Sequence, residues 1–140
     1  MDVQALEPLV GEWRTEVRMP GHDDVVCGRT TFEWLDGGAY LIQRAEMDDP
    51  VFPRGVMVIG PAVGGGRVVQ HYFDSRGVAR VYDISLEDGV LRLARDDDDF
   101  AQRYEGRLSA DGATIEGAWE ICEDGSTWEH DFDLHYAKIA

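Results

Sequence analysis

The four histidines are among the few residues of this sequence whose types could support chemistry. His130 alternates with the apolar residues Trp128, Phe132 and Leu134 in a segment of strand length, so these side chains share one face. This parity predicts that His130 faces the interior, although one β-bulge would reverse it. An interior imidazole can ligate iron, hydrogen-bond a ligand, act as an acid or base, or bond to a neighbouring core group.

A second candidate is the pair formed by Arg80 and Tyr82, which stand two residues apart in a predicted strand and therefore point to the same side. Across the preceding turn, Tyr72 and Gln70 are expected to lie opposite them. A guanidinium and a phenol match the geometry of a carboxylate, so this group is a candidate anion clamp. The alternative is an outward-facing Arg80 with Tyr82 packed on the wall, because the sequence alone leaves the register of the hairpin open.

The remaining histidines do not suggest a metal site. His135 has the opposite parity to His130, so the two cannot chelate one metal ion. His22 has acidic neighbours but no second nitrogen ligand at a suitable spacing, and we expect it in a surface loop. The acidic run 96–99 lacks the spacing of a calcium loop and is expected to form a solvated turn.

Two further sets of residues contain side chains of catalytic types. His71, Asp74 and Ser75 are the residue types of a hydrolytic triad, but they lie too close along one strand and turn to converge on a single atom. A triad is therefore rejected. Glu33 and Glu46 would supply a general base only if they faced inward, and nothing near them in the sequence requires that.

The two cysteines, Cys27 and Cys122, stand far apart, without a Cys-x-x-Cys motif or a histidine cluster. This pattern argues against a zinc site and a disulfide framework. We expect two free thiols that behave as small hydrophobic side chains.

The elements that must position these residues are strands. Aspartate followed by glycine recurs at 36–37, 88–89, 111–112 and 124–125, and each pair is flanked by segments rich in β-forming residues. A type I turn with a glycine bulge is expected at 74–77. Between the turns lie ten segments of strand length, at 10–19, 25–35, 39–47, 55–60, 66–73, 78–86, 90–95, 100–109, 113–122 and 127–137.

Ten sequential antiparallel strands avoid exposed edges by closing on themselves. The sequence therefore predicts an all-β fold, a single up-and-down barrel spanning residues 1–140, in which Val3–Leu9 forms a short helical turn capping one end. The loop 48–54, stiffened by two prolines, is expected to fold over a barrel mouth.

The composition excludes several partner classes. The chain has 140 residues and a formal net charge of −15, which would repel nucleic acid and anionic lipid. No apolar run approaches the length of a membrane span, and the first residues lack the features of a signal peptide. We therefore expect a cytoplasmic protein without nucleic-acid or membrane partners, and the sequence leaves both a monomer and a homodimer open.

The segment Leu9–Trp13 carries a Gly-x-Trp entry that resembles the calycin superfamily, which includes lipocalins, fatty-acid-binding proteins and nitrobindins. Three longer stretches are similar to a group of bacterial lipocalin-like proteins of unassigned function: RTTFEWLDGGAYLIQR (29–44), HYFDSRGVARVYDISL (71–86) and GAWEICEDGSTWEHDFDLHY (117–136). The resemblance covers nearly the whole chain and implies a calycin-like barrel.

The resemblance also implies two ways of holding a ligand. Nitrobindins bind heme through a histidine on the inner face of the final strand, and His130 lies at a similar position. Nitrobindins continue after the first tryptophan with a glycine-rich stretch, whereas this chain reads Arg14-Thr15-Glu16-Val17, so no cofactor is expected and heme is the alternative. Fatty-acid-binding proteins hold a carboxylate with a similar Arg-x-Tyr on their final strand.

The resulting hypothesis is a barrel that binds a mostly apolar or carboxylate-bearing small molecule in its interior. The residues expected to line or orient the site are Trp13, Arg80, Tyr82, Tyr104 and His130. One alternative is a small enzyme of the isomerase, cyclase or decarboxylase type that uses an interior histidine, His130 or His71, as acid or base. The others are heme binding through His130 and a filled barrel that acts through its outer surface or the loop 50–53.

Overall fold

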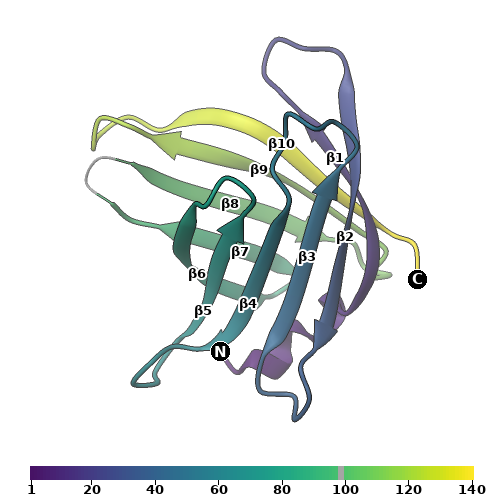
Figure 1. Cartoon of the computed structure of the whole chain (residues 1–140), viewed down its shortest axis with the longest axis vertical. Coiled ribbons are helices and arrows are strands. Elements are labelled where there is room, and N and C mark those ends of the chain that lie inside the picture. The colour runs from purple at the N-terminus through teal and green to yellow at the C-terminus, as the bar shows by residue number, and fades with distance from the viewer. Residues whose placement is uncertain (98–99) are drawn as a thin grey trace.

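The computed structural model describes residues 1–97 and 100–140. Within this part of the chain, ten antiparallel strands form one closed barrel, in which each strand pairs with its neighbours in the sequence and β10 returns to pair with β1 (Figure 1). The strands are β1 (Gly11–Arg18), β2 (Val25–Trp34), β3 (Leu41–Met47), β4 (Gly55–Pro61), β5 (Val68–Asp74), β6 (Ala79–Glu87), β7 (Val90–Arg95), β8 (Ala101–Leu108), β9 (Thr114–Cys122) and β10 (Glu129–Lys138). The predicted all-β, up-and-down barrel is confirmed.

The turns follow the expected chemistry. Asp88 and Gly89 both adopt positive φ, at 53° and 74°, as a two-residue hairpin turn between β6 and β7 requires. At the β5–β6 turn, the backbone N–H of Gly77 donates to the carbonyl of Asp74, and Gly77 has a φ of 81°. Asp98 and Asp99, within the predicted acidic turn, lie outside the described residues.

The short 3-10 helix η1 (Val3–Leu9) closes one end of the barrel, as predicted (Figure 1). The carboxylate of Asp2 caps it by accepting from the backbone N–H of Gln4. Its apolar residues, Leu6 and Leu9, are fully buried beside Trp13 of β1. The indole Nε1 of Trp13 donates to the carbonyl of Leu9 at 2.8 Å, which fixes the helix against the first strand.

Tyr104 fills the wall between β8 and β9, where two glycines face each other. Gly106 pairs with Gly117, and a Cβ at either position would lie 2.5–2.6 Å from the Tyr104 hydroxyl. The hydroxyl donates to the carbonyl of Leu134 at 2.9 Å, and burial raises the pKa of this phenol well above its ordinary value. Tyr104 is therefore a neutral, packed residue of the wall.

The outer face of the barrel carries exposed cross-strand ion pairs, including Arg44 with Glu33 and Arg92 with Glu105. Glu33 and Glu46 are both exposed, so neither faces the interior. Cys122 is buried and Cys27 half-buried, and both are free thiols, as expected. Among the described residues, no helix is long and apolar enough to span a membrane.

Candidate ligand-binding cavity

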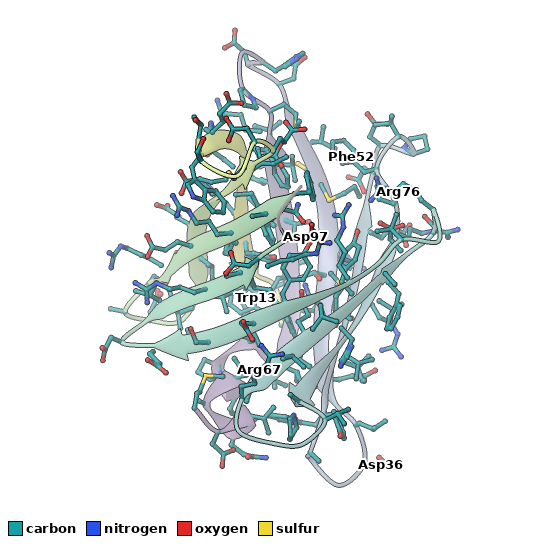
Figure 2. The ribbon with its side chains drawn as sticks, turned by 90° about the vertical axis from the view of Figure 1, so that its left-hand side faces the viewer. Trp13, Asp36, Phe52, Arg67, Arg76 and Asp97 are labelled. Carbon is teal, nitrogen blue, oxygen red and sulfur yellow. The ribbon has the colours of Figure 1, made fainter. Side chains whose placement is uncertain are left out.

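A cavity of about 350 Å³ occupies the barrel interior above η1. Its volume lies at the lower end of the range for small-molecule sites, about 300–1,000 Å³. The loop between β3 and β4 covers the mouth with Phe52 and Pro53, and Figure 2 shows Phe52 and Arg76 at the barrel end opposite Asp36. The apolar lining consists mainly of Leu9, Val17, Phe32, Met57, Ile84, Leu91, Leu93, Trp119, Phe132 and Leu134.

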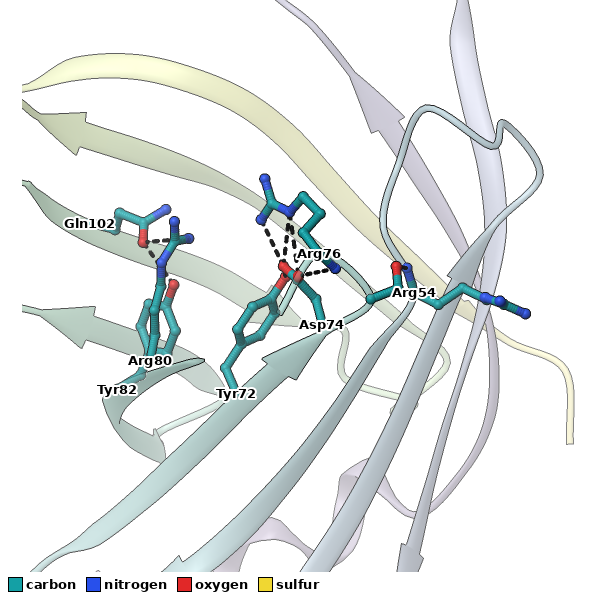
Figure 3. Close-up of polar contacts among 8 residues, drawn as sticks. Arg54, Tyr72, Asp74, Arg76, Arg80, Tyr82 and Gln102 are labelled. Atoms are coloured by element: carbon teal, nitrogen blue, oxygen red, sulfur yellow. Dashed lines mark hydrogen bonds and ion pairs between the residues drawn. The ribbon is translucent and has the colours of Figure 1, made fainter. Parts of the chain in front are cut away.

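Arg80, Tyr82 and Gln102 form a polar cluster on the cavity wall (Figure 3). The Tyr82 hydroxyl donates to Gln102 Oε1 at 2.7 Å, and Arg80 Nη1 approaches the same oxygen at 3.4 Å. In the β5–β6 pair, Gln70 stands opposite Tyr82 and Tyr72 opposite Arg80, which confirms the predicted register. Arg80 therefore faces inward with Tyr82, and the alternative of an outward-facing arginine is wrong.

Arg80 has no carboxylate partner in the part of the chain that the structure describes. Among the described residues, no carboxylate lies within 4.0 Å of its guanidinium, which is half-buried and lies over the ring of Phe100 at 5.2 Å from the centroid. Burial raises the pKa of the Tyr82 phenol, while the guanidiniums of Arg80, Arg95 and Arg76 oppose that rise. The cavity thus contains a locally positive region in a chain of net charge −15.

Arg76, in contrast, is already paired at the mouth. The side chain of Asp74 is fully buried. Its carboxylate accepts from Arg76 Nη2 at 2.6 Å and from the Tyr72 hydroxyl at 2.7 Å (Figure 3). Arg76 and Tyr72 hold the pKa of Asp74 well below its usual range. Burial, followed by the bond to Asp74, raises the pKa of Tyr72 to about 12.

The turn that carries Asp74 also anchors the mouth loop. The backbone N–H of Arg54 donates to Ser75 Oγ at 3.0 Å, and the Ser75 N–H donates to the Arg54 carbonyl at 2.8 Å. Asp74 and Ser75 thus serve the mouth, whereas His71 stands beside the exposed Val81 on the outer side of the β5–β6 pair. These three residues do not form a catalytic triad.

A chain of buried polar side chains crosses β2, β3 and β5. The Thr30 hydroxyl donates to the Arg44 carbonyl at 2.9 Å, Gln43 Nε2 donates to Thr30 Oγ1 at 3.3 Å, and Gln70 Nε2 donates to Gln43 Oε1 at 3.1 Å. Thr30, Gln43 and Gln70 all line the cavity. Each amide of this chain has at least one hydrogen-bond partner on the wall, which lowers the cost of burying it.

The prediction that His130 faces inward is wrong. The register between β9 and β10 shifts between His130 and Phe132, so His130 pairs with Glu120 on the outer side while Phe132 pairs with the cavity residue Trp119. This bulge reverses the parity. His130 is exposed, and its Nε2 lies 2.9 Å from Asp133 Oδ1.

The same bulge turns Asp131 toward the cavity, where burial raises the pKa of its carboxyl. None of the four histidines is among the cavity-lining residues. Neither the heme hypothesis nor the interior-histidine enzyme hypothesis therefore has its residue in place. In the described part of the chain, no group of three or more His, Cys, Asp or Glu side chains is arranged to hold a metal ion.

Of the five predicted site residues, Arg80 and Tyr82 line the cavity, while Trp13 and Tyr104 are buried around it and do not line it. Gln70 was expected only as a neighbour of the Arg80–Tyr82 pair, and Gln43 and Gln102 were not among the predicted site residues. The position of Gln102 could have been inferred from the sequence. It is followed by the outward-facing Arg103, so it belongs to the opposite face of its strand, which is otherwise apolar. The pairing of Gln43 with Gln70 had no such signal, since they lie 27 residues apart.

A larger groove of about 870 Å³ lies on the outer face of β1–β4, but it is open and its arginines are largely engaged. Arg29 pairs with Glu12 at 2.9 Å and Arg44 with Glu33 at 2.6 Å. Exposed pairs of this kind are screened by water and salt. The interior cavity, whose lining is mostly apolar, is the better candidate for ligand binding.

No family model matches the chain, and no curated protein matches it significantly. Among solved structures, the chain is similar to the crystal structure of Rv2717c from M. tuberculosis, with a TM-score of 0.66 over 99% of this chain and 97% of that chain. The sequence identity is 16%, so the similarity concerns the fold alone. It supports the ten-stranded antiparallel barrel.

Proposed function

We propose that this barrel binds a mostly apolar small molecule with a carboxylate head in its interior. The observation that carries the proposal is Arg80, a half-buried cation that faces an apolar cavity without a carboxylate partner among the described residues. Removing a cation from water is costly unless a counter-charge is supplied, and a ligand carboxylate would supply it.

The head-group site offers donors rather than acceptors. Arg80 can only donate, so its contact with Gln102 orients the amide with Oε1 toward Arg80 and Tyr82. The Nε2 group of Gln102 remains as a donor without a partner among the described residues. A carboxylate, which accepts through both oxygens, complements this arrangement.

Binding in the cavity is tested with a matched pair of substitutions. Val17 is 4% exposed and lines the cavity, whereas Val81 is 45% exposed on the outer face. Val17→Trp fills part of the cavity and should abolish binding of the neutral fluorescent probe N-phenyl-1-naphthylamine, while Val81→Trp should leave it unchanged. Equal binding by both folded variants would disprove interior binding.

The head-group assignment is tested by calorimetry with dodecanoate and dodecanol, which have alkyl chains of the same length and differ in the head group. Wild-type protein should prefer dodecanoate, and Arg80→Gln should weaken dodecanoate about tenfold without affecting dodecanol. Arg92→Gln removes the same charge from the outer face, where Arg92 pairs with Glu105, and should change neither affinity. An unchanged dodecanoate affinity in Arg80→Gln would contradict the assignment.

A further inference from the structure

The hydrogen-bond chain on the inner face of β2, β3 and β5 has a fixed direction. The Arg44 carbonyl can only accept, so Thr30 commits its single hydroxyl proton to it. Thr30 Oγ1 can then only accept, and the neighbouring Gln43 must turn its Nε2 toward it. The hydrogen-bond network thus assigns the oxygen and the nitrogen of the Gln43 amide, because the chain starts at a backbone carbonyl that can only accept.

The same constraint fixes the amide of Gln70, the last residue of the hydrogen-bond chain. Gln43 Oε1 is the acceptor that faces β5, so Gln70 must offer its Nε2 to it. The chain therefore ends on Gln70 Oε1. No described residue donates a hydrogen bond to this oxygen.

The terminal oxygen opens onto the cavity. Gln70 is only 5% exposed and lines the cavity, yet no buried side-chain N or O atom among the described residues lacks a partner. An oxygen without a protein donor must therefore be accessible from the cavity itself. A ligand that covers it with hydrocarbon would remove its water and leave it unsatisfied.

We propose that the ligand carries, besides its carboxylate, a hydroxyl or amide N–H that donates to Gln70 Oε1. This inference rests on the proposed function and narrows the ligand class to hydroxylated or amide-bearing carboxylic acids. Gln70 stands opposite Tyr82, two residues from Arg80, so the Cα atoms of Gln70 and Arg80 are offset by about 7 Å along the strands. The donor therefore belongs on the alkyl chain, several carbons from the carboxylate.

The test is calorimetry of wild-type protein with dodecanoate, with 3-, 6- and 9-hydroxydodecanoate, and with the corresponding oxo acids. At least one hydroxy acid should bind about tenfold more tightly than dodecanoate. It should also bind more tightly than its own oxo acid, which places an acceptor where the hydroxyl places a donor. This comparison needs no variant.

Substitutions then locate the effect. Gln70→Leu removes the acceptor and should abolish the preference for the hydroxy acid, whereas His71→Leu, on the outer side of the same strand, should retain it. If Gln70→Leu does not fold, Thr30→Val replaces it, since loss of the directing hydroxyl should reduce the discrimination between hydroxy and oxo acids.

Three results would overturn the inference. The first is dodecanoate binding without a preference for any hydroxy acid, which would leave the proposed function standing. The second is a hydroxyl preference that persists in folded Gln70→Leu. The third is a wild-type protein that binds none of these acids, which would refute the proposed function and this inference together.

Discussion

Replacing Gln102 by glutamate would supply from the protein the counter-charge that the ligand is proposed to bring. The new carboxylate would occupy the position of an oxygen that lies 2.7 Å from the Tyr82 hydroxyl and 3.4 Å from Arg80 Nη1. We therefore expect Gln102→Glu to pair with Arg80 and to repel an anionic ligand while leaving the cavity volume unchanged.

The magnitude follows from the distance and the exposure. Opposite unit charges about 4 Å apart attract by about 4 kcal/mol at an effective dielectric constant of about 20. Arg80 is half-buried, so water screens part of this attraction, and a net effect of about 1.5 kcal/mol is the reasonable scale. A ligand carboxylate that must displace this pair should bind at least about tenfold more weakly.

The assay is isothermal titration calorimetry with dodecanoate and dodecanol at pH 7. Dodecanoate should lose affinity in Gln102→Glu and dodecanol should not. Gln4→Glu adds the same charge on the exposed surface of η1 and serves as the control. An unchanged dodecanoate affinity in a folded Gln102→Glu protein would refute the reasoning that Arg80 binds the head group.

Three predictions concern stability. Trp13→Phe removes the donor to the buried Leu9 carbonyl and should lower the free energy of unfolding by about 1–3 kcal/mol in urea titrations; an unchanged value would show that the contact is dispensable. Gly117→Ala places a Cβ 2.5 Å from the Tyr104 hydroxyl and should lower the melting temperature, whereas an equal or higher one would contradict the packing. The pKa of Asp74 is lower in the folded state, so its stabilisation is present above its ordinary pKa, near 4, and is lost as the pH falls. Between pH 7 and pH 2, the melting temperature should therefore fall less steeply for Asp74→Asn than for the wild type. Identical slopes for the two proteins would refute this assignment.

Local patterns were sufficient to predict the architecture. Aspartate and glycine at 88–89 adopt the positive φ of a tight hairpin, and similar turns divide the chain into strands that pair with their sequence neighbours. The placement of Arg80 and Tyr82 opposite Tyr72 and Gln70 was also predictable, because the turn at 74–77 is short, but the sequence left open whether this side of the hairpin faces inward. Both inferences depend on residues close together in the chain.

The candidate site depended on more than local pattern. His130 satisfies the alternation of an inward-facing residue, yet one extra residue in β10 places it outside and Asp131 inside. A bulge has no reliable sequence signal, because its cost is set by the strand against which it pairs.

The sequence by itself thus determined a closed barrel of ten strands with Arg80 and Tyr82 on one side of a hairpin. Only the tertiary structure decided that the interior keeps a cavity and that Gln43 bonds to Gln70 on its wall. The physical reason is that hairpin register is a local property, whereas the volume left inside a closed sheet and the direction of a hydrogen-bond chain depend on side chains from many strands together.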